Sequence, residues 1–223
     1  MKNVIVISAH PDDEILGAGG TLLKHKSKGD NLGWIITTSI NKDQDLFKDK
    51  LAKREKEIKK VSKMVGFSNV YRLNYPVVTL NSDSMNDMVP KISSIFLEFK
   101  PEIIYVMNRS DAHSDHRYTF NSVMACTKSF RYPFIKKILM YECISETEFA
   151  PQLHEKVFIP NYFVDISDFF KQKIKIMQIY ESELDEHPFP RSERNIEALA
   201  TFRGATVGVE YAESFQVIKI IDK

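Results

Sequence analysis

The stretch VIVISAHPDDE at residues 4–14 joins a continuous apolar run directly to an imidazole and three carboxylates. A short apolar run rich in β-branched residues is typical of a strand buried on both faces of a parallel sheet. Adjacent carboxylates repel each other and are costly to desolvate, so a nearby group should compensate them. A bound cation is the obvious candidate. The simpler alternative is that these acids cap a helix.

Apolar runs and helical periods alternate along the first half of the chain. Strands are predicted at 3–7, 32–37, 70–73 and 102–107, with helices at 20–29, 47–66 and 85–99 between them. Pro90 fits the third of these helices only if it lies in the first turn. The alternation predicts an α/β fold: a single Rossmann-like domain over residues 1–223. Its mostly parallel sheet would have the core strand order 3-2-1-4 and be flanked by helices.

The second half of the chain is expected to extend this sheet. Strands are predicted at 136–142, 162–167 and 216–221. The stretch 167–184 has the pattern of a helix capped by Ser167. The segment from Asp185 to Ala212 contains HPFPRSER and FRGATVG, and we expect it to be a loop-rich lid.

Composition excludes some classes of protein. The 223 residues carry 31 basic and 30 acidic side chains, so bulk charge does not favour a nucleic-acid partner. No apolar stretch approaches the length of a membrane span, and we expect a cytoplasmic protein without a membrane anchor. Cys126 and Cys143 lack metal-finger spacing and are expected to be buried free thiols.

A second polar cluster, DAHSDHR at 111–117, follows the fourth predicted strand. In the order 3-2-1-4 the first and fourth strands are neighbours, and ligands bind beyond their carboxyl ends, where the order reverses. The clusters that should meet there comprise His10, Asp12 and Asp13 from the first strand and His113, Asp115 and His116 from the fourth.

Imidazoles and carboxylates together favour a transition metal. Two imidazoles and one carboxylate leave a position open for water, which is the ligand set expected of catalytic zinc. Nickel, iron and cobalt accept the same ligands, whereas an all-oxygen site would favour magnesium or calcium. The clusters supply one carboxylate beyond those the metal needs, as a hydrolytic site with a general base requires.

Several motifs resemble one family. AHPDDE at 9–14 and HSDH at 113–116 are similar to the motifs of the LmbE-like, or PIG-L, zinc-dependent N-deacetylases, which act on N-acetylglucosamine conjugates. REKE at 54–57, YESE at 180–183 and FRGATVGVEYAESF at 202–215 follow in the family's order. Two departures, TTSINKD at 37–43 and Glu183 where glutamine is usual, concern the substrate rather than the metal.

The resemblance implies a role for each motif residue. The zinc ligands would be His10, Asp13 and His116. Asp12 corresponds to the general base, and His113 to the imidazole that stabilises the oxyanion or protonates the leaving amine. Asp115 would hold His113 in its charged, oriented form, and Arg54 matches a position that contacts substrate hydroxyls.

The expected function is metal-dependent removal of an N-acetyl group from a small, soluble amino-sugar conjugate. The metal would be zinc or another divalent transition metal. Two alternatives remain: a metal-dependent sugar-binding module without catalysis, and a magnesium-dependent phosphohydrolase. Some relatives form trimers or hexamers, so the resemblance also allows a homo-oligomer.

Overall fold

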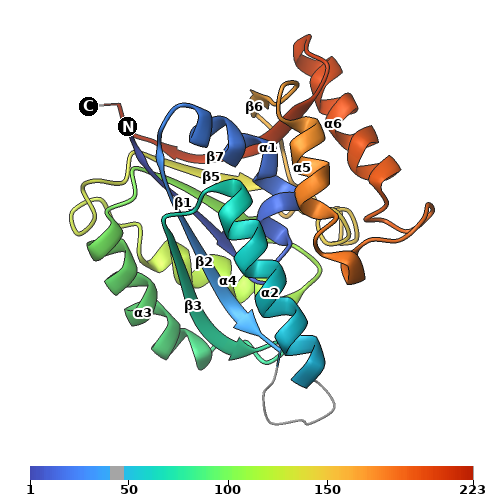
Figure 1. Ribbon diagram of the computed structural model, residues 1–223. Coiled ribbons are helices and arrows are strands. Elements are labelled where there is room, and N and C mark those ends of the chain that lie inside the picture. The colour runs from blue at the N-terminus through green and yellow to red at the C-terminus, as the bar shows by residue number, and fades with distance from the viewer. Residues whose placement is uncertain (41–47, 223) are drawn as a thin grey trace.

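The computed structural model describes residues 1–40 and 48–222. A seven-stranded sheet with the order β3-β2-β1-β4-β5-β7-β6 lies at its centre (Figure 1). The strands are β1 (Asn3–Ser8), β2 (Asn31–Ser39), β3 (Asn69–Pro76), β4 (Ile103–Met107), β5 (Lys137–Tyr141), β6 (Tyr162–Asp165) and β7 (Ala212–Ile220). Within the described residues, β7 runs antiparallel to β5 and β6 on either side of it, and the pairs among β1 to β5 are parallel. The expected α/β fold and the core order 3-2-1-4 are therefore confirmed.

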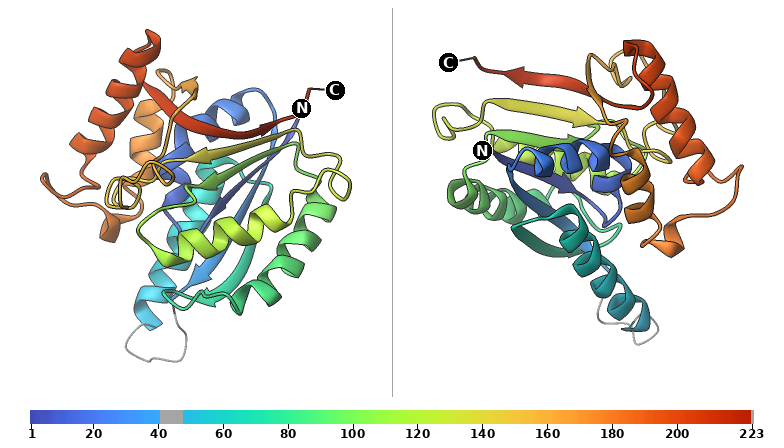
Figure 2. Two further views of the ribbon diagram at one scale, coloured as in Figure 1. Left: turned by 180° about the vertical axis from the view of Figure 1, so that it is seen from behind. Right: turned by 45° about the horizontal axis from the view of Figure 1, so that its top comes forward.

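Helices cover both faces of the sheet. They are α1 (Asp13–Ser27), α2 (Lys48–Val65), α3 (Ser84–Phe99), α4 (Ser114–Ala125), α5 (Phe170–Met177) and α6 (Glu193–Val207). α3 and α4 pack together on one face, while α1 lies between α2 and α5 on the other (Figure 2). α6 packs against β6 and β7 at the antiparallel edge. Among the described helices, none is both long and apolar enough to cross a membrane.

The central strand β1 explains the unbroken apolar run. Residues 4–7 have no exposed surface, because helices cover both sides of the strand. α1 then approaches the sheet closely: a Cβ built on Gly17 would lie 2.1 Å from Cδ2 of Tyr141. The hydroxyl of Tyr141 donates to the Ile7 carbonyl at 2.8 Å. The absence of a side chain at Gly17 thus allows α1, which carries the acidic motif, to pack closely against Tyr141 of the sheet.

Several local predictions were wrong. α1 begins at Asp13 rather than at residue 20, and the helix α4 was not predicted. Pro90 lies inside α3 beyond the first turn. Its missing N–H would have paired with the carbonyl of Asn86, and both residues are exposed, so water can solvate that carbonyl. Phe47, expected on the apolar face of the second helix, lies outside the described residues.

Two predictions for the C-terminal half were also wrong. Ser167 does not cap α5, which begins at Phe170; its hydroxyl bonds the Asp165 carboxylate at 2.6 Å instead. The stretch from Asp185 to Ala212 is not a loop-rich lid, because α6 occupies its middle. Cys126 and Cys143 are buried and free, as expected.

Candidate active site

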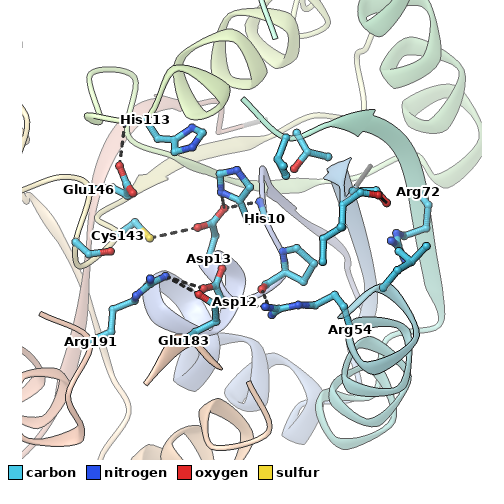
Figure 3. A pocket seen from close by; sticks show the side chains of 17 residues that line it. His10, Asp12, Asp13, Arg54, Arg72, His113, Cys143, Glu146, Glu183 and Arg191 are labelled. Atoms are coloured by element: carbon cyan, nitrogen blue, oxygen red, sulfur yellow. Dashed lines mark hydrogen bonds and ion pairs between the residues drawn. The ribbon is translucent and has the colours of Figure 1, made fainter. Parts of the chain in front are cut away.

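The two polar clusters meet beyond the carboxyl ends of β1 and β4, which pair in parallel. The ring of His10 lies 4.5 Å from that of His113 and 5.4 Å from that of His116, measured between centroids. Figure 3 shows His10 and His113 at one side of a pocket whose volume is about 350 Å³. The strand order alone thus brings together residues far apart in the sequence.

His10, Asp13 and His116 have the geometry of a metal ligand set. One potential ligand atom from each lies within 4.8 Å of the others. The Nε2 atom of His116 is buried without a hydrogen-bond partner, 3.3 Å from Oδ2 of Asp13. Buried polar atoms are rarely left unpaired, and this nitrogen points toward a second ligand atom. These residues therefore fit a divalent transition metal.

Charge interactions within the cluster lead to the same conclusion. Burial alone would raise the pKa of Asp13, but the His116 and His10 imidazoles hold it well below its usual value. Burial likewise opposes protonation of His116, yet the Asp13 and Asp111 carboxylates raise its pKa well above the usual range. The Asp13 and Asp111 carboxylates thus create a negative environment around His116, which suits a cation.

Asp115 belongs to a second group of potential ligands, with His10 and His113. Its carboxylate, however, already accepts hydrogen bonds from the backbone N–H groups of Val78 at 2.8 Å and Leu80 at 3.3 Å. Oδ2 of Asp13 likewise accepts from the backbone N–H groups of Ala9 and His10, at 3.0 and 2.8 Å. The group containing Asp13 fits a metal better because it includes the unpaired Nε2 of His116.

Asp111 orients one of these imidazoles. Its Oδ2 accepts from Nδ1 of His116 at 2.8 Å, and its Oδ1 accepts from Asn108 at 2.8 Å and Thr147 at 2.7 Å. A carboxylate on Nδ1 leaves Nε2 free for a metal, which is a common arrangement around metal-bound histidine. The sequence pattern had not marked Asp111, although it belongs to the DAHSDHR motif.

Asp12 lies beside this cluster in a strained backbone conformation, with φ of 142°. Its backbone N–H donates to Oε2 of Glu14 at 3.1 Å, and its Oδ2 accepts from Arg191 at 3.0 Å. The side chain makes no capping bond to α1, so the helix-cap alternative fails here. Burial and the nearby Asp13 charge raise the pKa of Asp12 well above its usual value. A carboxyl with that proton affinity suits a general base.

Glu14 is a second residue whose role the sequence did not reveal. It is fully buried, and its Oε1 lies 3.0 Å from the hydroxyl of Tyr180. Burial raises the pKa of Glu14 to about 8. Because Glu14 holds the backbone of Asp12, it contributes to the strained conformation that places the Asp12 carboxyl at the pocket.

His113 and Asp115 do not make the contact expected of them. The Asp115 carboxylate lies 3.8 Å from Nδ1 of His113, beyond hydrogen-bond length. It anchors the backbone at Val78 instead and lies 3.3 Å from Nε2 of His10. Nδ1 of His113 accepts from the Asp115 backbone N–H at 3.1 Å, so its other nitrogen carries the proton in the neutral ring. Burial lowers the pKa of His113 to about 4.

Arg54 lines the pocket, as the motif suggested, but its guanidinium already has protein partners. It donates to the Pro11 carbonyl at 3.1 Å and forms an ion pair with Glu183. Glu183 also lies 3.3 Å from Nη1 of Arg191, the residue that contacts Asp12. A continuous chain of opposite charges therefore runs along this side of the pocket.

Fold and site together define a doubly wound α/β protein with a histidine–aspartate centre at the point where the strand order reverses. Residues 5–127 match the family model PIG-L, described as GlcNAc-PI de-N-acetylase. The match spans more than half of the chain, and the protein belongs to this family of deacetylases.

The sequence identity between this chain and individual relatives is low. The chain is 24% identical to a diacetylchitobiose deacetylase of Thermococcus kodakarensis, over 98% of this chain and 84% of that protein. It is 23% identical to a probable N-acetyl-alpha-D-glucosaminyl L-malate deacetylase 2 of Bacillus cereus, over 82% of this chain and 84% of that protein. The structure of N,N'-diacetylchitobiose deacetylase from Pyrococcus horikoshii superimposes with a TM-score of 0.76 at 23% identity, covering 98% and 84%. That likeness shows the shared fold.

Proposed function

We propose that this protein is a metal-dependent hydrolase that removes the N-acetyl group from a small N-acetylglucosamine-type conjugate. The products would be acetate and a free amine. The observation that carries the proposal is the unpaired, buried Nε2 of His116, which faces Asp13 beside a second carboxyl of raised pKa, Asp12. A binding module has no need of that second carboxyl, whereas hydrolysis requires a proton acceptor there.

His10, Asp13 and His116 would hold the metal, with zinc as the expected ion. When bound, such a cation supplies a Lewis acid that polarises the amide carbonyl and acidifies a water molecule. Asp111 holds the Nδ1 proton of His116, so that Nε2 is the nitrogen that would face the metal. The ligand types disfavour the magnesium-dependent alternative, since magnesium prefers oxygen ligands.

Two side chains would assist the hydrolysis. The Asp12 carboxylate accepts the proton of the attacking water, and its burial makes it a stronger base than an exposed aspartate. His113 lies at the pocket wall next to His10, with its second nitrogen available to the substrate. From there it would donate a hydrogen bond to the developing oxyanion, since a ring whose pKa is lowered to about 4 is neutral and carries one proton. Asp115 supports it from the backbone of α4.

The substrate class follows from the family and from the relatives. The names of the relatives specify diacetylchitobiose and an N-acetylglucosaminyl malate, and both substrates are conjugates of N-acetylglucosamine. A pocket of about 350 Å³ is of a size that small-molecule sites have. Arg54 lies on its wall and would limit the space around the sugar. We propose that residues 1–223 act as a single catalytic domain.

Acetate release from a panel of N-acetylglucosamine conjugates tests this function. Zinc-loaded wild-type protein should be active, and chelated protein should lose activity that added zinc restores. Asp12→Asn should retain its metal but lose about 100-fold or more in kcat, as expected when a general base is removed. Asp87→Asn is the matched control, because Asp87 is an exposed partner of Lys91 away from the pocket.

The alternatives predict different results. A sugar-binding module would bind the conjugates equally well with either residue at position 12 and release no acetate. Full activity in Asp12→Asn, or in protein shown to be free of metal, would contradict the proposed chemistry.

A further inference from the structure

Besides residues of the candidate metal ligand set, three arginines line the pocket: Arg54, Arg72 and Arg191. Each already has a carboxylate partner from the protein. Arg72 pairs with Glu55 at 2.9 Å, while Arg54 and Arg191 share Glu183. Among the described residues, the pocket therefore presents no arginine whose charge is left for a substrate.

Glu183 pairs with two of these three arginines, so the net charge that the pocket presents to a substrate depends on it. It belongs to the short 3-10 helix η2 (Glu181–Glu183), and its side chain is 21% exposed. In Figure 3 it lies at the foot of the pocket, next to Asp12 and Arg191. An anionic group entering here would have to displace Glu183 from its arginines or lie beside two carboxylates. Both arrangements are costly, since like charges at short range repel and a displaced carboxylate loses its partners.

A neutral group meets no such penalty. Hydroxyl groups can donate to the outer lone pairs of a carboxylate that is already paired with arginine, because each carboxylate oxygen accepts more than one hydrogen bond. Glu183 and its paired arginines, which repel an anion, can therefore bind sugar hydroxyls.

We infer that Glu183 determines specificity, so that the pocket selects amino-sugar conjugates whose second half is uncharged. The inference rests on the proposed deacetylase function and narrows its substrate class. It chooses between two chemistries that the relatives represent, since diacetylchitobiose is neutral and a malate conjugate is anionic.

A matched pair of substrates tests the inference. The 2-hydroxyethyl and carboxymethyl glycosides of N-acetylglucosamine, as the same anomer, have similar shapes but differ by one negative charge. Wild-type protein should show a kcat/KM about tenfold or more higher for the hydroxyethyl glycoside, which corresponds to about 1.4 kcal/mol. Glu183→Gln keeps the shape but removes the negative charge, and its single acceptor oxygen can serve one of the two arginines, which contact different oxygens of Glu183. The preference should then fall about tenfold or reverse.

Glu181→Gln is the control, since Glu181 lies on the same 3-10 helix but is exposed and pairs with Lys53 outside the pocket. It should leave the ratio of the two kcat/KM values unchanged. Any effect of Glu183→Gln on Asp12 would act on both glycosides alike and so cancels in that ratio. A wild-type protein that cleaves both glycosides equally, or a ratio that Glu183→Gln does not change, would overturn the inference.

Binding gives a second readout that does not depend on turnover. The affinities of both glycosides for metal-free protein, measured by calorimetry, should show the same preference and the same response to Glu183→Gln. If neither glycoside is cleaved but this pattern holds, the proposed reaction fails and the charge selectivity stands. If neither glycoside binds, or both bind alike, the charge selectivity fails even where acetate is released from other conjugates.

Discussion

Replacing Asp111 with asparagine should weaken metal binding by roughly 10- to 100-fold, because it removes the carboxylate that orients His116. Asp111 is fully buried and accepts three hydrogen bonds, from His116, Asn108 and Thr147. An asparagine side chain offers one acceptor oxygen and one donor amide in the same space. It cannot satisfy all these partners as they now stand.

Either orientation of the new amide has a cost. If its oxygen faces His116, its NH2 group opposes the side-chain amide of Asn108, and a buried donor left unpaired costs about 1–3 kcal/mol. If its NH2 group faces His116, the ring must place its proton on Nε2, which then cannot bind a metal. The expected loss in affinity corresponds to about 1.4–2.7 kcal/mol.

The assay is a zinc titration of metal-free protein in competition with a chromophoric chelator. Asp87→Asn serves as the control for a surface aspartate and should match wild type. Urea unfolding of the metal-free proteins separates a general loss of stability from a loss of metal affinity. An Asp111→Asn protein that is folded and binds zinc as tightly as wild type would refute this account of the site.

Three further outcomes are expected. Saturating zinc at about 100 times its Kd should stabilise wild-type protein by about 2.7 kcal/mol in urea unfolding, and His116→Ala should abolish most of that gain. Metal-free wild-type protein should lose stability as pH rises from about 5 to 8, because buried Glu14, with its pKa raised to about 8, keeps a proton that the unfolded chain releases near its ordinary value of 4.5. Glu14→Gln, which mimics the protonated acid, should flatten that slope. Gly17→Ala should destabilise the protein by about 1–3 kcal/mol, since the added methyl group overlaps the Tyr141 ring.

For each of these predictions, one result would contradict the reasoning. A zinc response that persists in His116→Ala would place the metal elsewhere. Equal pH slopes for wild type and Glu14→Gln would mean that another group titrates. An unchanged urea midpoint in Gly17→Ala would show that α1 can shift away from the sheet at little cost.

Local sequence predicted the elements whose apolar pattern is strong, and failed where contacts between distant residues decide. The four predicted strands up to residue 107 all exist. β1, β2 and β4 are largely buried, and a buried parallel strand must be apolar on both faces, whereas β3 is a partly exposed edge strand. Ser167 looked like a helix cap, but the neighbouring Asp165 captures its hydroxyl. Pro90 was expected only in a first turn, yet solvent at the exposed surface of α3 allows it further inside.

The sequence by itself determined the α/β class, the strand order of the core and the meeting of the two polar clusters. The physical reason is that alternating strands and helices favour a parallel sheet, and the common doubly wound form of that sheet has the order 3-2-1-4. Only the tertiary structure showed how the site is held. Arg191 contacts Asp12 from 179 positions away, and Tyr180 contacts Glu14 from 166 positions away. Such partners leave no local pattern, because the fold, not their spacing in the chain, sets the distance between them.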